Sequence, residues 1–218
     1  MLQVVDVVNV KSNKMNSIIQ NHCNDLVTRF DTIAPNRKLT LAKLAAFIQN
    51  KKDNKLPIQL VYVCTHNSRR SHFGQVWAAV AAEYYGIASV RTFSGGTEAT
   101  AFNPNAIEAL LNTGFQVHKE VEGSNPLYTV SFGGTHSPRC FSKVYKDSEN
   151  PTENFAAIMT CSDAEENCPF IPGVEMRLAT TYDDPKAFDG TPYEKEKYLE
   201  RSNQIALETL YVFSLVIL

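Results

Sequence analysis

The chain has 218 residues, of which 44% are hydrophobic and 20% are charged, a composition that fits one globular α/β domain with a modest addition rather than two full domains. Its net charge of −2 gives no overall basic field, so nucleic acid and anionic membranes are not expected partners. Five cysteines, an odd number in a chain long enough to bury its own core, argue against a secreted disulfide scaffold. Residues 1–10 lack a secretory signal pattern, and the apolar run 210–218 is too short to span a bilayer. We therefore expect a cytoplasmic protein.

The first part of the chain, residues 1–55, is expected to form a helical extension. Apolar side chains recur at helical spacing over residues 15–33 and again over 41–48, with a proline-containing link between them. The polar, charged stretch 51–55 follows, and it is the best candidate for the boundary between this extension and the rest of the chain. We therefore predict an N-terminal helical hairpin followed by a catalytic domain over residues 56–218.

A strand, a loop and a helix follow directly. Residues 58–63 are apolar and β-branched, as in a buried strand, and residues 71–85 have helical periodicity. The intervening loop places Cys64 at the carboxyl end of the strand, where open α/β sheets hold their ligands. This position makes the loop the first candidate for a functional site.

The chemistry of this loop favours a tetrahedral oxyanion. Backbone N–H groups entering a helix converge on one point, and the helix dipole adds positive potential there. A thiolate at Cys64 is stabilised in the same way and is expected to act as a nucleophile. Arg70, separated from Cys64 by five loop residues, offers a planar fork of donors to two anion oxygens, and Ser71 can donate its hydroxyl to the sulfur. The candidate oxyanion-binding residues are Thr65, His66, Asn67, Ser68, Arg69 and Ser71.

The remaining elements alternate between strand and helix with one interruption. A strand over 89–93 is followed by a helix that starts near Pro104. Residues 119–153 break the pattern with glycines and prolines around two short alternating runs, which indicates a β-hairpin insertion. Strands are expected again at 155–160 and 174–182. They are followed by a last helix that begins at a capping-box sequence, Thr191 to Glu194, with Pro192 in the first helical position.

A carboxylate follows the last predicted strand. The sequence Asp183-Asp184-Pro185 places a turn at the carboxyl edge of the sheet, close to the anion loop. When a cysteine displaces an oxygen from a tetrahedral anion, a carboxylic acid can protonate the departing oxygen. An Asp-Pro pair alone is usually only a turn, but beside the nucleophile loop Asp184 is the candidate general acid.

Two further cysteines lie on one polar segment after the strand at 155–160. If this segment packs as helix, Cys161 and Cys168 are about 10 Å apart, too far to bridge, so a disulfide requires local unwinding. That would be a redox switch open to thiol-disulfide exchange. The alternatives are two unrelated cysteines or half of a zinc site, for which only the distant His118, His136 or Cys140 could supply further ligands. We expect no bound metal or cofactor.

Four loop residues match a known pattern. Cys64, Asn67, Arg70 and Ser71 stand where the low-molecular-weight protein tyrosine phosphatase superfamily has C-x-x-N-x-x-R-S, and residues 184–185 resemble its general-acid motif. The resemblance implies an open parallel four-stranded sheet with flanking helices. The N-terminal helical hairpin and the β-hairpin insertion would be additions to that fold.

Within this superfamily the chain is most similar to thioredoxin-coupled arsenate reductases. Residues 94–98 and 103–106 resemble their segment after the second strand, and Cys161 with Cys168 resembles their resolving pair. The likeness covers residues 57–218 apart from the insertion. It implies that Cys64 attacks arsenate, that the two later cysteines form the disulfide, and that thioredoxin reduces it.

The departures leave other functions open. His66 stands where the superfamily usually has glycine, Arg69 where it has a small or thiol side chain, and residues 186–188 (Lys-Ala-Phe) replace the tyrosines that stack on phosphotyrosine. One alternative is a phosphohydrolase for phosphotyrosine or aryl phosphates that works through a phosphocysteine. The other is a redox-gated oxyanion-binding module without catalysis. All three take a small oxyanion or an anionic group.

Overall fold

The computed structural model describes residues 15–134, 136–167 and 171–217. The helices are α1 (Ser17–Val27), α2 (Pro35–Asp53), α3 (Arg70–Tyr84), α4 (Pro104–Thr113), α5 (Ser162–Asn167) and α6 (Glu194–Ser214), with short 3-10 helices η1 (Phe30–Thr32) and η2 (Pro185–Phe188). The strands are β1 (Ile58–Cys64), β2 (Val90–Gly96), β3 (Gln116–Val121), β4 (Leu127–Ser131), β5 (Arg139–Cys140), β6 (Phe155–Met159) and β7 (Val174–Ala179).

The main sheet has four parallel strands in the order β2-β1-β6-β7, which confirms the predicted fold class. Because the strands are parallel, their carboxyl ends meet at one edge. Cys64, the last residue of β1, pairs with Gly96 of β2, and Val63 pairs with Met159 of β6. The sequence-distant segments that follow these strands are thereby gathered around Cys64.

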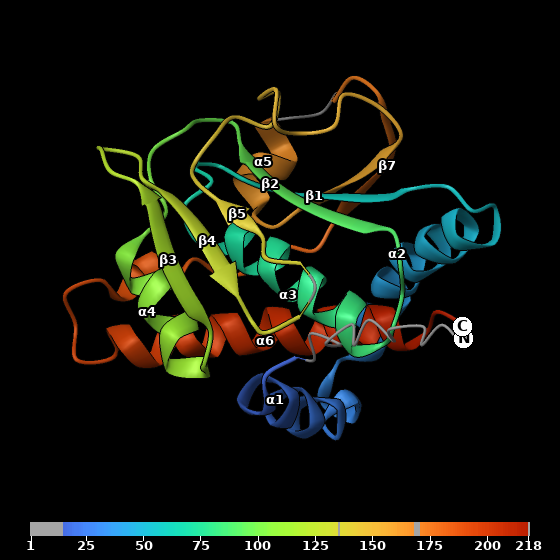
Figure 1. The fold of residues 1–218 in the computed structure, drawn as a ribbon, viewed down its shortest axis with the longest axis horizontal. Helices are drawn as coiled ribbons and strands as arrows, with labels where there is room; N and C mark the ends of the chain where they lie inside the picture. Colours follow the sequence, from blue (N-terminus) through green and yellow to red (C-terminus); the bar gives the residue numbers. More distant parts are fainter. Residues whose placement is uncertain (1–14, 135, 168–170, 218) are drawn as a thin grey trace, which may run out of the picture.

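Helices cover both faces of this sheet (Figure 1). The helix α3 lies between the sheet and α6, so it is buried nearly all round, as its continuous apolar composition requires. Trp77 of α3 is fully buried and donates its indole N–H to Ser202 Oγ of α6 (3.0 Å). The short helix α5 contacts β1 and β6. Its Ala164 is buried in a second, smaller apolar cluster with Val61 and Val63.

The N-terminal region contains the predicted pair of helices. The helix α1 packs on α6 through Ile19, Cys23 and Leu26, and these side chains join the main core. The helix α2 begins at Pro35, inside the link expected before the apolar run 41–48, because proline is favoured in the first helical position. Since α1 and α2 share the core of the remainder, the division at residue 55 stays a prediction.

The insertion forms a small antiparallel sheet in the order β3-β4-β5. Its first strand, β3, starts at Gln116, before the predicted start of the insertion at residue 119, and the sequence pattern does not indicate this strand. The strand β5 has only two residues because the chain beyond it turns toward β2: Gly96 N donates to Lys143 O (2.8 Å), and Tyr145 N donates to Gly96 O (2.9 Å). The insertion therefore reaches the carboxyl end of β2.

The last strand and the last helix each differ from the sequence prediction at one end. The last strand, β7, ends at Ala179 rather than residue 182. The helix α6 begins at Glu194 rather than at Pro192, because the Glu194 carboxylate accepts the backbone N–H of Gly190 (2.7 Å) instead of closing a capping box on Thr191. No helix within the described ranges is long and apolar enough to cross a bilayer.

Candidate active site

The predicted strand-loop-helix unit is present, with Cys64 ending β1 and Arg70 beginning α3. Cys64 is buried, and its Sγ lies 3.1 Å from Ser71 Oγ in the first turn of α3. Ser71 Oγ also accepts a hydrogen bond from Asn67 Nδ2 (2.8 Å), so its own hydroxyl proton is free to point at the sulfur. Ser71 is thus placed to donate a hydrogen bond to Cys64 Sγ.

Asn67 shapes the loop through its backbone and its side chain. It is fully buried and has a left-handed φ of 43°, a conformation that asparagine tolerates better than most residues. While its Nδ2 reaches Ser71, its Oδ1 accepts the backbone N–H of Lys143 (2.9 Å) from the insertion. The insertion thus holds the residue that orients Ser71.

Gly96 allows the β2 turn to approach the loop closely. A Cβ at this position would lie 2.6 Å from Thr65 O and 2.7 Å from Asn67 N and would clash with Glu98 O. The same approach lets Glu98 N donate to Thr65 O (2.8 Å). Only glycine fits here without moving the nucleophile loop.

The predicted general acid meets the loop arginine. Arg70 Nη2 donates to Asp184 Oδ2 (2.6 Å), and Arg70 Nη1 donates to Tyr182 O (2.8 Å). Asp184 Oδ1 also accepts the N–H of Lys186 (3.1 Å), which fixes the carboxylate at the start of η2. Arg70 Nε is buried and has no hydrogen-bond partner among the described residues, so a donor remains for a bound oxyanion.

Arg69 stabilises residues 182–189, which carry the candidate acid and are called the acid segment below. Its Nε donates to Tyr198 Oη (2.8 Å), and its guanidinium lies 3.6 Å from Asp189 and 3.9 Å from Asp184. Tyr198 Oη in turn donates to Asp189 Oδ1 (2.7 Å). Sequence reasoning missed Tyr198 and Asp189, because nothing in their local pattern indicates a contact with the loop.

Three other loop side chains engage their surroundings. Thr65 Oγ1 donates to Asp163 Oδ2 (2.7 Å), and Ser68 Oγ donates to Ala101 O (2.7 Å). The half-exposed His66 has its Nε2 3.6 Å from Glu98 Oε2. The backbone N–H groups of these residues, rather than their side chains, are what the loop can offer to an anion.

Cys161 lies beside the nucleophile loop. It is buried after β6 in the same apolar cluster as Cys64, and its Sγ is 3.4 Å from Thr65 Oγ1. Cys168, its predicted partner, lies outside the described residues. Cys23 and Cys140 are buried elsewhere, and burial raises the pKa of each thiol to about 12, which makes both poor nucleophiles.

The described parts of the chain contain no cluster of three or more His, Cys, Asp or Glu side chains that could hold a metal ion. The groups that the loop brings together are instead a thiol, an arginine and a carboxyl, with a second thiol at its rim. They are suited to bind a tetrahedral oxyanion and to attack it.

The chain is similar in sequence to curated arsenate reductases. One from Bacillus subtilis is 28% identical over 149 residues, covering 68% of this chain and 87% of the relative. One from Staphylococcus aureus is 25% identical over 150 residues, covering 68% of this chain and 92% of the relative. No family model matches the chain.

Solved structures share the fold. A mutant of YwlE from Bacillus subtilis is 16% identical with a TM-score of 0.50, covering 72% of this chain and 97% of the other. A low-molecular-weight phosphotyrosine phosphatase from Vibrio cholerae is 12% identical with a TM-score of 0.50, covering 72% and 95%. The sequence similarity confirms the predicted resemblance to arsenate reductases, and the solved structures confirm the predicted fold.

Proposed function

We propose that this chain is an arsenate reductase that works through a cascade of three thiols. The observation that carries the proposal is the position of Cys161, whose sulfur touches Thr65 of the nucleophile loop and shares a buried cluster with Cys64. A phosphatase needs one thiol at this loop. A second thiol at its rim supports a reaction in which sulfur, rather than water, takes the covalent intermediate apart.

The proposed first step forms a bond between Cys64 and arsenic. The Cys64 thiolate attacks arsenate held by the loop amides and by Arg70, and Asp184 protonates the departing oxygen, which leaves as water. The Cys161 thiolate then attacks Cys64 Sγ. A Cys64–Cys161 disulfide forms, the electron pair of the S–As bond stays on arsenic, and arsenite leaves.

The proposed second half of the cycle restores the nucleophile. Cys168 attacks Cys161, which frees Cys64 and leaves a Cys161–Cys168 disulfide. Thioredoxin, a dithiol reductant, supplies the two electrons that return this disulfide to thiols. Such a cycle needs no bound cofactor, and it requires a reducing compartment such as the cytoplasm.

The test is arsenate-dependent NADPH oxidation with thioredoxin and thioredoxin reductase. We expect Cys161→Ser to lower turnover at least about 100-fold, because the arsenic-bound intermediate then has no resolving thiol. Cys23→Ser is the matched control, since Cys23 is equally buried but lies in α1 away from the loop, and it should retain turnover. Full activity of Cys161→Ser would show that another thiol resolves the intermediate.

Phosphatase activity is the second candidate. It is favoured by the pairing of Arg70 with Asp184, which serves a phosphoryl group as well as an arsenate, and by the fold shared with the Vibrio cholerae phosphatase. Hydrolysis of p-nitrophenyl phosphate by both wild type and Cys161→Ser, without arsenate-dependent turnover in wild type, would replace the reductase proposal with this one. Inactivity in both assays would leave the redox-gated oxyanion-binding module.

A further inference from the structure

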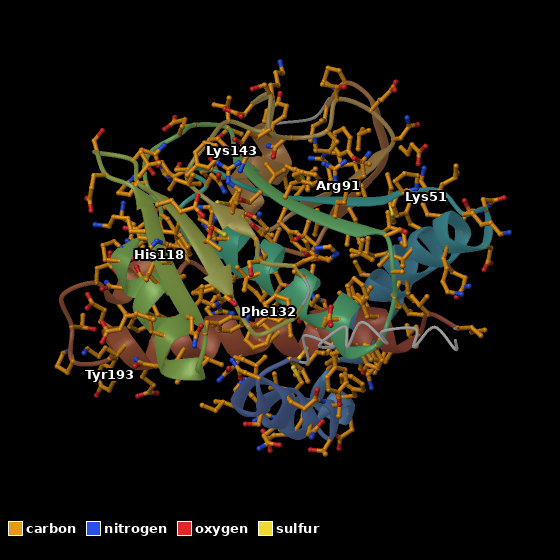
Figure 2. All side chains as sticks on the ribbon, in the orientation of Figure 1. Lys51, Arg91, His118, Phe132, Lys143 and Tyr193 are labelled. Carbon is orange, nitrogen blue, oxygen red and sulfur yellow. The ribbon has the colours of Figure 1, made fainter. Side chains whose placement is uncertain are left out.

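A cavity of about 1100 Å³ lies apart from the nucleophile loop. Its walls come from α3, from the edge of β2 and from the insertion, and none of the residues that line it belongs to the loop 64–71 or to the acid segment. The apolar part of the wall includes Ala79 and Ala82 of α3 and Val90 of β2. Figure 2 shows Lys143, another lining residue, beside the carboxyl end of β2.

Lys143 is an unusual residue for such a wall. Lys143 is only 4% exposed. Among the described residues, however, no carboxylate lies within ion-pair distance of its ammonium. Lys51 is equally buried, and it is paired with Glu175 at 2.5 Å. The Lys143 ammonium instead lies 4.4 Å from the centroid of the Phe141 ring.

A buried ammonium without a counter-ion is energetically costly. Burial accordingly lowers the pKa of Lys143, although the more distant carboxylates of Asp147 and Glu149 act in the opposite direction. An anion that enters the cavity would relieve this cost. Three cations and two carboxylates line the cavity, namely Lys143, Arg91, Arg139, Glu83 and Glu149. Arg139 already holds Glu149 (3.2 Å).

We propose that this cavity is a second anion site that takes a small organic anion, with its charged group on the Lys143 ammonium and its apolar body against α3 and β2. The apolar wall selects an organic molecule over an inorganic ion, since an inorganic ion would leave that surface uncovered. The site is independent of the chemistry at Cys64 and does not rest on the proposed reductase activity.

The experiment uses 8-anilinonaphthalene-1-sulfonate, an aromatic sulfonate that fluoresces when it binds an apolar site. Titrated into the folded full chain, the sulfonate should bind the wild type. Lys143→Met, which keeps the side-chain length and removes the charge, should lower this affinity about tenfold. Lys143→Arg should retain the affinity. Lys51→Met, which removes the paired buried lysine, should leave it unchanged.

The neutral analogue N-phenyl-1-naphthylamine separates charge recognition from apolar binding, and it should bind wild type and Lys143→Met equally. Ala79→Trp should abolish binding of both probes by filling the cavity, which keeps the proposal testable if Lys143→Met does not fold. Saturating phosphate should not displace the sulfonate. Equal sulfonate affinity in wild type and Lys143→Met, or displacement by phosphate, would overturn the second site.

Discussion

Asp184 is the residue whose surroundings best match a role in proton transfer. Its carboxylate lies against Arg70, whose buried Nε has no hydrogen-bond partner among the described residues, so an anion bound at Cys64 and the acid could share one guanidinium. The neighbouring Asp183 has a side chain that is 98% exposed and lies 3.7 Å from Arg201. Of two adjacent aspartates, only Asp184 is oriented toward the loop arginine.

This difference gives a residue-scale prediction. Asp184→Asn should lower arsenate-dependent turnover about 10²–10⁴-fold, because the departing oxygen loses its proton donor. The control, Asp183→Asn, should stay near the wild-type rate. Steady-state turnover with saturating thioredoxin measures both, and equal losses in the two variants would remove Asp184 from the proton-transfer step.

At the scale of elements, the acid segment is tied to the N-terminal helices. Arg37 of α2 pairs with Glu208 of α6 at 2.8 Å, and its guanidinium lies 4.9 Å from the centroid of the Tyr182 ring. Tyr182 Oη donates to the same carboxylate (2.8 Å), while its carbonyl accepts from Arg70. One chain of contacts therefore connects α2 and α6 with the arginine of the nucleophile loop.

The ion pair between Arg37 and Glu208 is expected to stabilise the fold. Arg37→Met should lower the free energy of unfolding by about 3 kcal/mol, because it leaves the buried Glu208 carboxylate without its counter-ion. Adding Glu208→Gln to that variant should recover part of the loss, since the uncompensated charge is removed. Urea denaturation of wild type, both single variants and the double variant measures the coupling. Additive losses would mean that the two side chains do not act as a pair.

At the scale of the whole molecule, a buried histidine makes stability depend on pH. His72 is fully buried in α3, and burial lowers its pKa to about 3. Its Nδ1 lies 3.2 Å from Ser94 Oγ, and that hydroxyl donates to Gln75 Oε1 (2.7 Å), so the neutral ring carries its proton on Nδ1. The folded state thus keeps His72 neutral where the unfolded chain would protonate it.

Because of this difference in proton binding, the folded state is expected to lose stability as the pH falls. Below about pH 6.5 the unfolded chain binds a proton at His72 and the folded chain does not, so stability falls as the pH decreases toward about 3, by up to about 1.4 kcal/mol per pH unit. His72→Gln should therefore show a shallower loss of stability over this range. Urea denaturation at pH 7, 6, 5 and 4 measures it, and parallel curves for the two proteins would contradict the assignment.

The nucleophile loop could be predicted from sequence because its geometry is local. A buried strand, a turn and a helix N-terminus within residues 58–71 fix the positions of Cys64, Arg70 and Ser71 through short-range hydrogen bonds. The four strands of the main sheet could be predicted as well, since each has its own apolar run and is followed by a helix or a turn. Hydrophobic pattern and local backbone preference were sufficient for the loop and for these strands, whereas the parallel order of the sheet was implied by the resemblance to the phosphatase superfamily.

Only the tertiary structure decided how this loop is held. Asp184 reaches Arg70 across 114 residues, Lys143 holds Asn67 across 76, and Cys161 meets Thr65 across 96. Such contacts depend on how the sheet closes and where the insertion turns back to β2, and no local propensity encodes either. The amino-acid sequence by itself determined a strand-loop-helix unit that carries Cys64, Arg70 and Ser71. The packing of distant segments decided how Asp184 and Cys161 come to lie beside it, because parallel strands bring their carboxyl ends together whatever their separation in the chain.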